Sequence, residues 1–194
     1  MMRVEMRSTT CIGLICCAAA LVAAAVVHAA TSDTIVVTAK VVAGTTLSVA
    51  GTGSPSFALT LTGDDQTTSY TLPVAAVDAR GLTTGGGWNL TVTSTQFNAG
   101  SGHVFPTTAS TITGVTSGCG TNSTCTVPTN SVPNTNLALP AGSVAPTAVK
   151  YYNAATATGL GTSNVNATVS VAVPANVFAG TYTSTVTVSI VAGP

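Results

Sequence analysis

The placement of apolar residues at every second position is the strongest constraint on the fold of this chain. From residue 164 to residue 173, valine or alanine at each odd position alternates with asparagine, threonine, serine or alanine at the even positions. The same period of two recurs over 57–62, 88–93 and 182–190. Such alternation, rich in β-branched residues, is typical of strands that bury one face in an antiparallel sheet.

Five further segments have a weaker strand pattern, and turn-forming residues separate the whole series. The weaker segments are 34–42, 45–50, 69–78, 110–116 and 145–152. Glycine, proline, asparagine and aspartate cluster at 51–55, 62–66 and 174–180, which favours turns there, and we expect long loops within 98–146. Many short strands without a helical period predict an all-β fold, an antiparallel β-sandwich of the immunoglobulin-like or Greek-key type.

The N-terminal segment has the organisation of a secretory signal. Arg3 and Arg7 precede an apolar run over 11–30, in which Val27 and Ala29 occupy the third-last and last positions before the expected cleavage site. We therefore expect a signal peptide over 1–29 and a single domain over 30–194. About 20 apolar residues also suffice to span a bilayer, so retention of this segment as a membrane anchor is the alternative.

Charged residues are scarce in the expected mature chain. A net charge of −1 follows from its seven charged residues, Asp33, Asp64, Asp65, Asp78, Lys40, Arg80 and Lys150. A nucleic-acid-binding protein needs a basic patch, and attraction to an anionic membrane surface needs one as well. The composition therefore predicts no nucleic-acid partner, and no membrane partner once the signal is cleaved.

Two cysteines remain after the expected cleavage, in the stretch GCGTNSTC. Cys119 and Cys125 are separated by five residues, and in an exported protein such a pair is typical of a disulfide that closes a small loop. A structural zinc site would need four Cys or His ligands, and His103 is the one histidine that could join these two. We expect a disulfide and no metal.

The residues that could support catalysis are few and lack a recognisable pattern. Asp64 and Asp65 are adjacent in a turn, where aspartate bonds to the local backbone. No G-x-S-x-G nucleophile motif is present, and no Lys-Ser or Lys-Thr follows the glycines at 85–87 as a phosphate-binding loop requires. The sequence thus predicts a protein that is not an enzyme and needs no cofactor.

The stretch VDARGLTTGGGWNL holds the only tryptophan and the most suggestive polar pair. Asp78 and Arg80 would form an ion pair that holds the loop, or else a polar anchor for a saccharide or peptide beside the indole. Trp88 shares a strand face with Leu90 and Val92, which favours a place in the core, although tryptophan also stacks on sugar rings.

These residues resemble the WxL domains of Gram-positive surface proteins. Trp88-Asn89-Leu90 is similar to the first Trp-x-Leu motif of that family, and VDARGLTTGGG is similar to the segment that precedes it. The second motif is typically Tyr-x-x-x-aliphatic-Thr-Trp-x-Leu-x-x-x-Pro. Its spacing is reproduced here with valine in place of tryptophan and isoleucine in place of leucine, by Tyr182, Val186, Thr187, Val188, Ser189, Ile190 and Pro194.

The resemblance covers about 35–194 and implies an exported protein at the wall or surface of a Gram-positive cell. Members of the family attach non-covalently to peptidoglycan and occur in complexes with other surface proteins. The C-terminal stretch PANVFAGTYTSTVTVSIV also resembles the last hairpin of spore-coat and fimbrial β-sandwich proteins. The alternative function is therefore a secreted structural subunit that assembles through strand pairing.

Overall fold

The computed structural model describes residues 35–82 and 86–194. The chain divides into two units, Met1–Ala39 and Lys40–Pro194. Residues 35–39 are the described part of the first unit, and they have no regular structure. The predicted signal peptide lies outside the described residues. Among those residues, no helix is long and apolar enough to cross a membrane.

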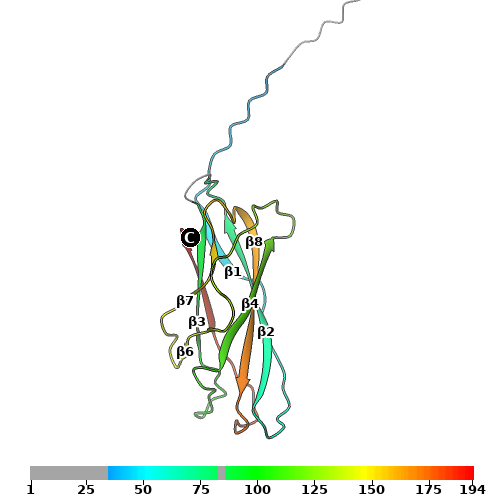
Figure 1. Ribbon diagram of the computed structural model, residues 1–194, viewed down its shortest axis with the longest axis vertical. Helices are drawn as coiled ribbons and strands as arrows, with labels where there is room; N and C mark the ends of the chain where they lie inside the picture. Colours follow the sequence, from blue (N-terminus) through cyan, green and yellow to red (C-terminus); the bar gives the residue numbers. More distant parts are fainter. Residues whose placement is uncertain (1–34, 83–85) are drawn as a thin grey trace, which may run out of the picture. The chain divides into compact units, whose positions relative to one another are not determined.

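The unit over 40–194 consists of two β-sheets packed face to face (Figure 1). The larger sheet has the order β1-β2-β8-β4-β5, with the bounds Leu47–Gly51, Gln66–Asp78, Gly161–Val173, Ser110–Cys119 and Leu137–Ala138. In the smaller sheet, β3 (Trp88–Thr95) pairs with β9 (Val186–Ala192) along one edge, and with β7 (Val149–Ala154) and β6 (Ala141–Gly142) along the other. All pairs are antiparallel except β3–β6, and the all-β sandwich predicted from the sequence is confirmed.

The longest strands form the centre of the larger sheet. β8 pairs with β2 along all of Gly161–Val173 and with β4 along most of its length. The odd-numbered residues of β8 from Ser163 onward are buried, and the even-numbered ones are more exposed. This is the alternation read from the sequence, and it directs one face of β8 toward the smaller sheet.

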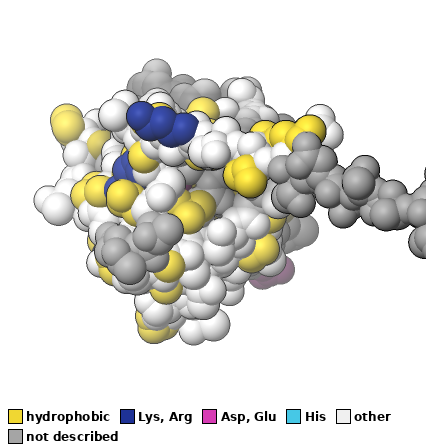
Figure 2. Space-filling view, turned by 90° about the horizontal axis from the view of Figure 1, so that it is seen from above, with side chains coloured by type: hydrophobic (Ala, Val, Ile, Leu, Met, Phe, Trp, Pro, Cys, Tyr) yellow, Lys and Arg dark blue, Asp and Glu magenta, His cyan; other side chains and the backbone are white. Residues whose placement is uncertain are grey.

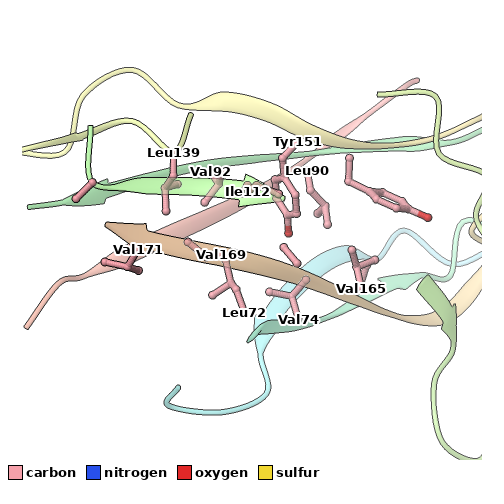
Figure 3. Packing of buried hydrophobic residues seen from close by; sticks show 14 of the residues in the cluster. Leu72, Val74, Leu90, Val92, Ile112, Leu139, Tyr151, Val165, Val169 and Val171 are labelled. Carbon is pink, nitrogen blue, oxygen red and sulfur yellow. The ribbon is translucent and has the colours of Figure 1, made fainter. Parts of the chain in front are cut away.

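The space between the sheets is filled by apolar side chains from both of them (Figure 3). Val165, Val169 and Val171 from β8 face Leu90 and Val92 from β3 across the sandwich, and all five are fully buried. Charged side chains are few on the surface, as the view in Figure 2 illustrates, so the fold depends on this apolar packing.

Most strand predictions are confirmed, with shifted ends. The segments 45–50, 69–78, 88–93, 110–116, 145–152 and 164–173 correspond to β1, β2, β3, β4, β7 and β8. The strand expected over 182–190 begins only at Val186, and the stretch 98–146 contains β4, β5 and β6 as well as loops. Two predictions are wrong, because 57–62 and the described part of 34–42 form no strand.

The segment 57–62 forms no strand because the chain separates from β2 after residue 52, before this segment begins. The last ladder bond of the β1–β2 hairpin joins the Thr52 N–H to the Pro73 carbonyl. Beyond it, Phe57 stacks on Tyr70 at 6.1 Å between ring centroids and meets the edge of Phe97, which follows β3. The segment thus bridges from the larger sheet to the smaller one, so its alternation is not used in pairing.

The predicted disulfide between Cys119 and Cys125 is present. It joins the end of β4 to the following loop, with 5.4 Å between the Cα atoms. The Gly120 N–H donates to the Thr162 carbonyl at 2.8 Å, and the Thr126 N–H donates to the Leu160 carbonyl at 3.0 Å. The small loop is therefore fixed to the start of β8.

We expect removal of this disulfide to lower stability modestly. In the chain-entropy model a loop of this size contributes about 2 kcal/mol. The double variant Cys119→Ser with Cys125→Ser should therefore have a free energy of unfolding about 2 kcal/mol lower than that of wild type in denaturant titration. Reduced wild-type protein should match the variant. Two reactive thiols in the unfolded but unreduced protein would contradict the bond.

Candidate functional site

Trp88 is a core residue at one end of the sandwich. Its side chain is fully buried, it lies 5.5 Å from Tyr152 in a stacked arrangement, and its Nε1–H donates to the Gly159 carbonyl at 3.1 Å. Leu90, the other residue of the first motif, is also fully buried. Neither side chain is accessible to a ligand, so the core interpretation of Trp88 is confirmed and no sugar platform exists at this position.

Two glycines make room for the indole and for the strand that bears it. Gly159 has a φ of +75°, and a Cβ on it would lie 2.5 Å from Trp88 Nε1. Gly87 has a φ of +113°, and a Cβ on it would lie 2.6 Å from the Ala154 carbonyl oxygen. Both positions therefore need glycine for space and for backbone conformation. This explains why a glycine directly precedes the tryptophan.

Asp78 and Arg80 form an ion pair that fastens the same end. Arg80 donates from Nε to Asp78 Oδ1 at 2.9 Å and from one terminal nitrogen to Oδ2 at 2.8 Å, a bidentate arrangement. The same nitrogen donates to the Gly87 carbonyl at 2.8 Å. The Asp78 side chain is fully buried. The loop-holding ion pair is confirmed, and a polar anchor for an external ligand is not what the geometry provides.

The ion pair also changes the protonation of the carboxyl group. Burial alone would raise the pKa of Asp78, but the hydrogen bonds and the charge of Arg80 outweigh it, so the pKa lies below its ordinary value. Arg80 in turn has a raised pKa, first because of its side-chain hydrogen bond to Asp78. We call this region, with Asp78, Arg80, Trp88, Gly159 and the disulfide, the locked end.

The first part of the second motif, from Tyr182 to Val188, lies at the other end of the strands beside a large groove, and the rest of the motif runs along β9 back to the Trp88 end. The groove encloses about 1230 Å³, more than the roughly 300–1,000 Å³ of a small-molecule site. Its walls are the segment 53–61, parts of β1 and β2, and the chain from Val177 to Val188. Tyr182 and Val188 line it, whereas Ile190 packs against the core further along β9.

The lining of the groove is uncharged and partly exposed. None of its residues is Asp, Glu, Lys or Arg. Burial raises the pKa of Tyr70 to about 12, so this phenol in the groove stays neutral at ordinary pH. Phe178 is 64% exposed and Leu59 is 37% exposed, although both line the groove. The surface is suited to an apolar ligand that covers these side chains.

Sequence reasoning did not find this groove. Its walls come from segments that are distant in the chain. One wall is the segment 53–61, which no longer pairs with β2. The alternating Phe57, Leu59 and Leu61 were a signal for an apolar segment, but the pattern indicated a strand and not a wall.

The remaining candidates show no chemistry of their own. His103 packs on Phe178 at 4.1 Å between ring centroids, and Asp65 accepts a hydrogen bond from the Ala175 N–H. A second cleft, lined by Thr95, Gln96, Asn98 and their neighbours, is polar, but these side chains already bond to the backbone around them. Within residues 35–82 and 86–194, no three His, Cys, Asp or Glu residues could hold a metal ion.

Comparison of the chain with protein-family models, with curated proteins and with solved structures found no match. Any functional assignment therefore depends on the sequence and on the geometry described above.

Truncation of Trp88 should destabilise the fold. Loss of a fully buried large aromatic side chain costs about 3–5 kcal/mol, so Trp88→Ala should lower the free energy of unfolding by that amount in denaturant titration. Trp88→Phe is the matched control, because it keeps a ring but leaves the Gly159 carbonyl without its donor, and it should cost less. A Trp88→Ala protein as stable as wild type would contradict the core role.

The stability of the protein should fall in acid because of Asp78. A carboxyl whose pKa is lowered by folding stabilises the native state above its unfolded pKa of about 3.9, and this contribution is lost as the pH falls through the folded pKa. Asp78→Asn should lower stability at pH 7 by about 1–3 kcal/mol and reduce the loss between pH 7 and pH 3. Asp64→Asn, at an exposed turn, is the matched control and should keep the wild-type stability at pH 7 in thermal unfolding.

Proposed function

We propose that this chain is an exported, non-enzymatic protein of a Gram-positive cell surface, attached non-covalently to partner surface proteins or to the peptidoglycan wall. The observation that carries the proposal is the apolar groove beside β9, with Phe178 and Leu59 exposed in it. Large exposed apolar surfaces on a folded domain are typical of interaction sites.

The chemistry of the groove favours a protein segment over a bare sugar chain. Sugar recognition uses exposed aromatic platforms together with polar groups, and the single indole of this protein is buried. The groove has aliphatic and aromatic walls with serine and threonine hydroxyls among them and no charged group, and its most exposed ring is Phe178 and not an indole. Binding to the wall would then depend on proteins that the wall carries.

The resemblance to WxL domains supports a location at the cell surface. The two motifs of the resemblance have different roles in this proposal. The first motif, at Trp88 and Leu90, stabilises the locked end. The second, at Tyr182 and Val188, borders the groove. Valine in place of the second tryptophan leaves more space there, so the ligand of this chain differs from one that stacks on an indole.

A second candidate function is a structural subunit that assembles by strand pairing, and the smaller sheet favours it. In the described chain β9 pairs with β3 alone; its other edge lies beside β1 without forming a ladder with it. Exposed sheet edges are sites of strand addition in many complexes.

The proposal predicts that the protein is retained by cell-wall preparations through the groove. Walls that carry their proteins and walls stripped by protease should be compared in cosedimentation, and we expect retention mainly on the former. Phe178→Asp should reduce retention at least tenfold, because it places a charge in the apolar groove.

Val144→Asp is the matched control, since Val144 is 82% exposed and does not line the groove. It should bind like wild type. Absence of retention on both preparations, or equal loss in both variants, would contradict the proposal.

A further inference from the structure

All four phenylalanines of the chain line the groove, together with two tyrosines. Five of these rings form a continuous row, in which the centroids of neighbouring rings are between 4.4 Å and 6.1 Å apart. The row has the order Tyr70, Phe57, Phe97, Phe105 and Tyr182. Consecutive aromatic rings therefore form a wall of the groove, although aromatic residues are only 5% of the sequence.

The hydroxyl of Tyr70 is a hydrogen-bond donor that the fold leaves unused. Among the described residues it has no hydrogen-bond partner, and it is not fully buried, unlike the hydroxyl of Tyr151. The hydroxyls of Tyr182 and Ser184, by contrast, donate to carbonyls of the chain itself. Because burial raises the pKa of Tyr70 to about 12, its phenol keeps the proton at ordinary pH. Tyr70 can therefore donate to a carbonyl oxygen of a ligand.

The rest of the lining restricts the polar groups that a ligand can bring. No Asp, Glu, Lys or Arg lines the groove, so an ionised group of a ligand would lose its water without gaining an opposite charge. Each backbone N–H of a ligand also needs an acceptor once it leaves water. An apolar segment that has carbonyl groups and few N–H groups avoids both costs.

A β-strand is a common partner of a sheet edge, but β1 restricts its access to β9. β1 lies beside the outer edge of β9, and Cα atoms of the two strands come within 8 Å of one another. A strand inserted between them would place them about 10 Å apart, which is twice the spacing of paired strands. Strand addition there would require β1 to move, whereas a ligand held by side-chain contacts needs no such rearrangement.

We propose that the groove binds a proline-rich segment of a partner surface protein in the polyproline II conformation. This inference rests on the proposed function and names the chemistry of its partner. Proline has an apolar ring and no N–H, while its carbonyl remains an acceptor. The polyproline II helix is already formed in solution, so its binding costs little conformational entropy. Its rings pack against the aromatic row, and Tyr70 donates to one of its carbonyls.

The first test measures the choice of ligand by the fluorescence anisotropy of two labelled peptides of equal length. One is an oligoproline peptide, and the other alternates threonine and valine, a composition that favours an extended strand. We expect wild-type protein to bind the oligoproline peptide at least tenfold more tightly. Tighter binding of the threonine–valine peptide, or binding of neither, would overturn the proposal.

The second test removes one hydroxyl group. Tyr70→Phe keeps the ring in the aromatic row but loses the donor, so it should weaken oligoproline binding about two- to tenfold, the effect of one uncharged hydrogen bond. Tyr151→Phe is the matched control, because its hydroxyl is buried, has no partner and does not line the groove. It should bind like wild type. Equal affinities in both variants, each with a cooperative thermal transition, would contradict the hydrogen bond and with it the proposal.

Competition on cell-wall preparations separates this inference from the proposed function. Soluble oligoproline should release wild-type protein from walls that carry their proteins, and the threonine–valine peptide should not. Retention that oligoproline does not reduce would overturn the inference and leave surface attachment standing. Oligoproline binding by a protein that no wall preparation retains would reject surface attachment and leave the ligand chemistry of the groove standing. Wild-type dimers that Phe178→Asp dissociates would assign the groove to a second copy and overturn the inference.

Discussion

The burial of one face of β8 is the constraint on which the rest of the structure depends. This strand pairs with β2 along its whole length and with β4 on its other edge, and its alternate valines are fully buried. Because the chain has few charged residues and one ion pair among those described, no polar interaction could replace this apolar layer. The positions of β2 and β4 follow from β8, and the smaller sheet then covers the apolar face that these three strands share.

The two ends of the sandwich have opposite characters. At one end the Asp78–Arg80 pair, the buried indole of Trp88 and the Cys119–Cys125 loop hold neighbouring segments by specific bonds. At the other end the sheets separate around the groove, where aromatic rings such as Phe57 and Tyr70 pack on one another and no ion pair or disulfide is present among the described residues. Specific local bonds stabilise the first end, which leaves the second to present apolar surface without loss of the fold.

The parts of the fold that were predictable from sequence are those governed by local pattern. Period two located β8, β3 and most of β2, and the spacing of Cys119 and Cys125 indicated their bond. The same pattern predicted a strand over 57–62, and this prediction is wrong. Alternation indicates that one face of a segment is apolar, but it does not indicate that a neighbouring strand is present to pair with it. The groove depends on which segments meet in space, and a single sequence does not contain that information in any short window.

The scarcity of charge has a consequence for the complex proposed above, in which a partner occupies the groove. Ionic contacts loosen when salt screens them, whereas apolar contacts strengthen in salts such as sulfate. The groove contains no charged side chain, and the Asp78–Arg80 pair is shielded from solvent. Concentrated salt would therefore not dissociate such a proposed complex, and its dissociation would require an agent that solvates apolar surface, such as urea or guanidinium.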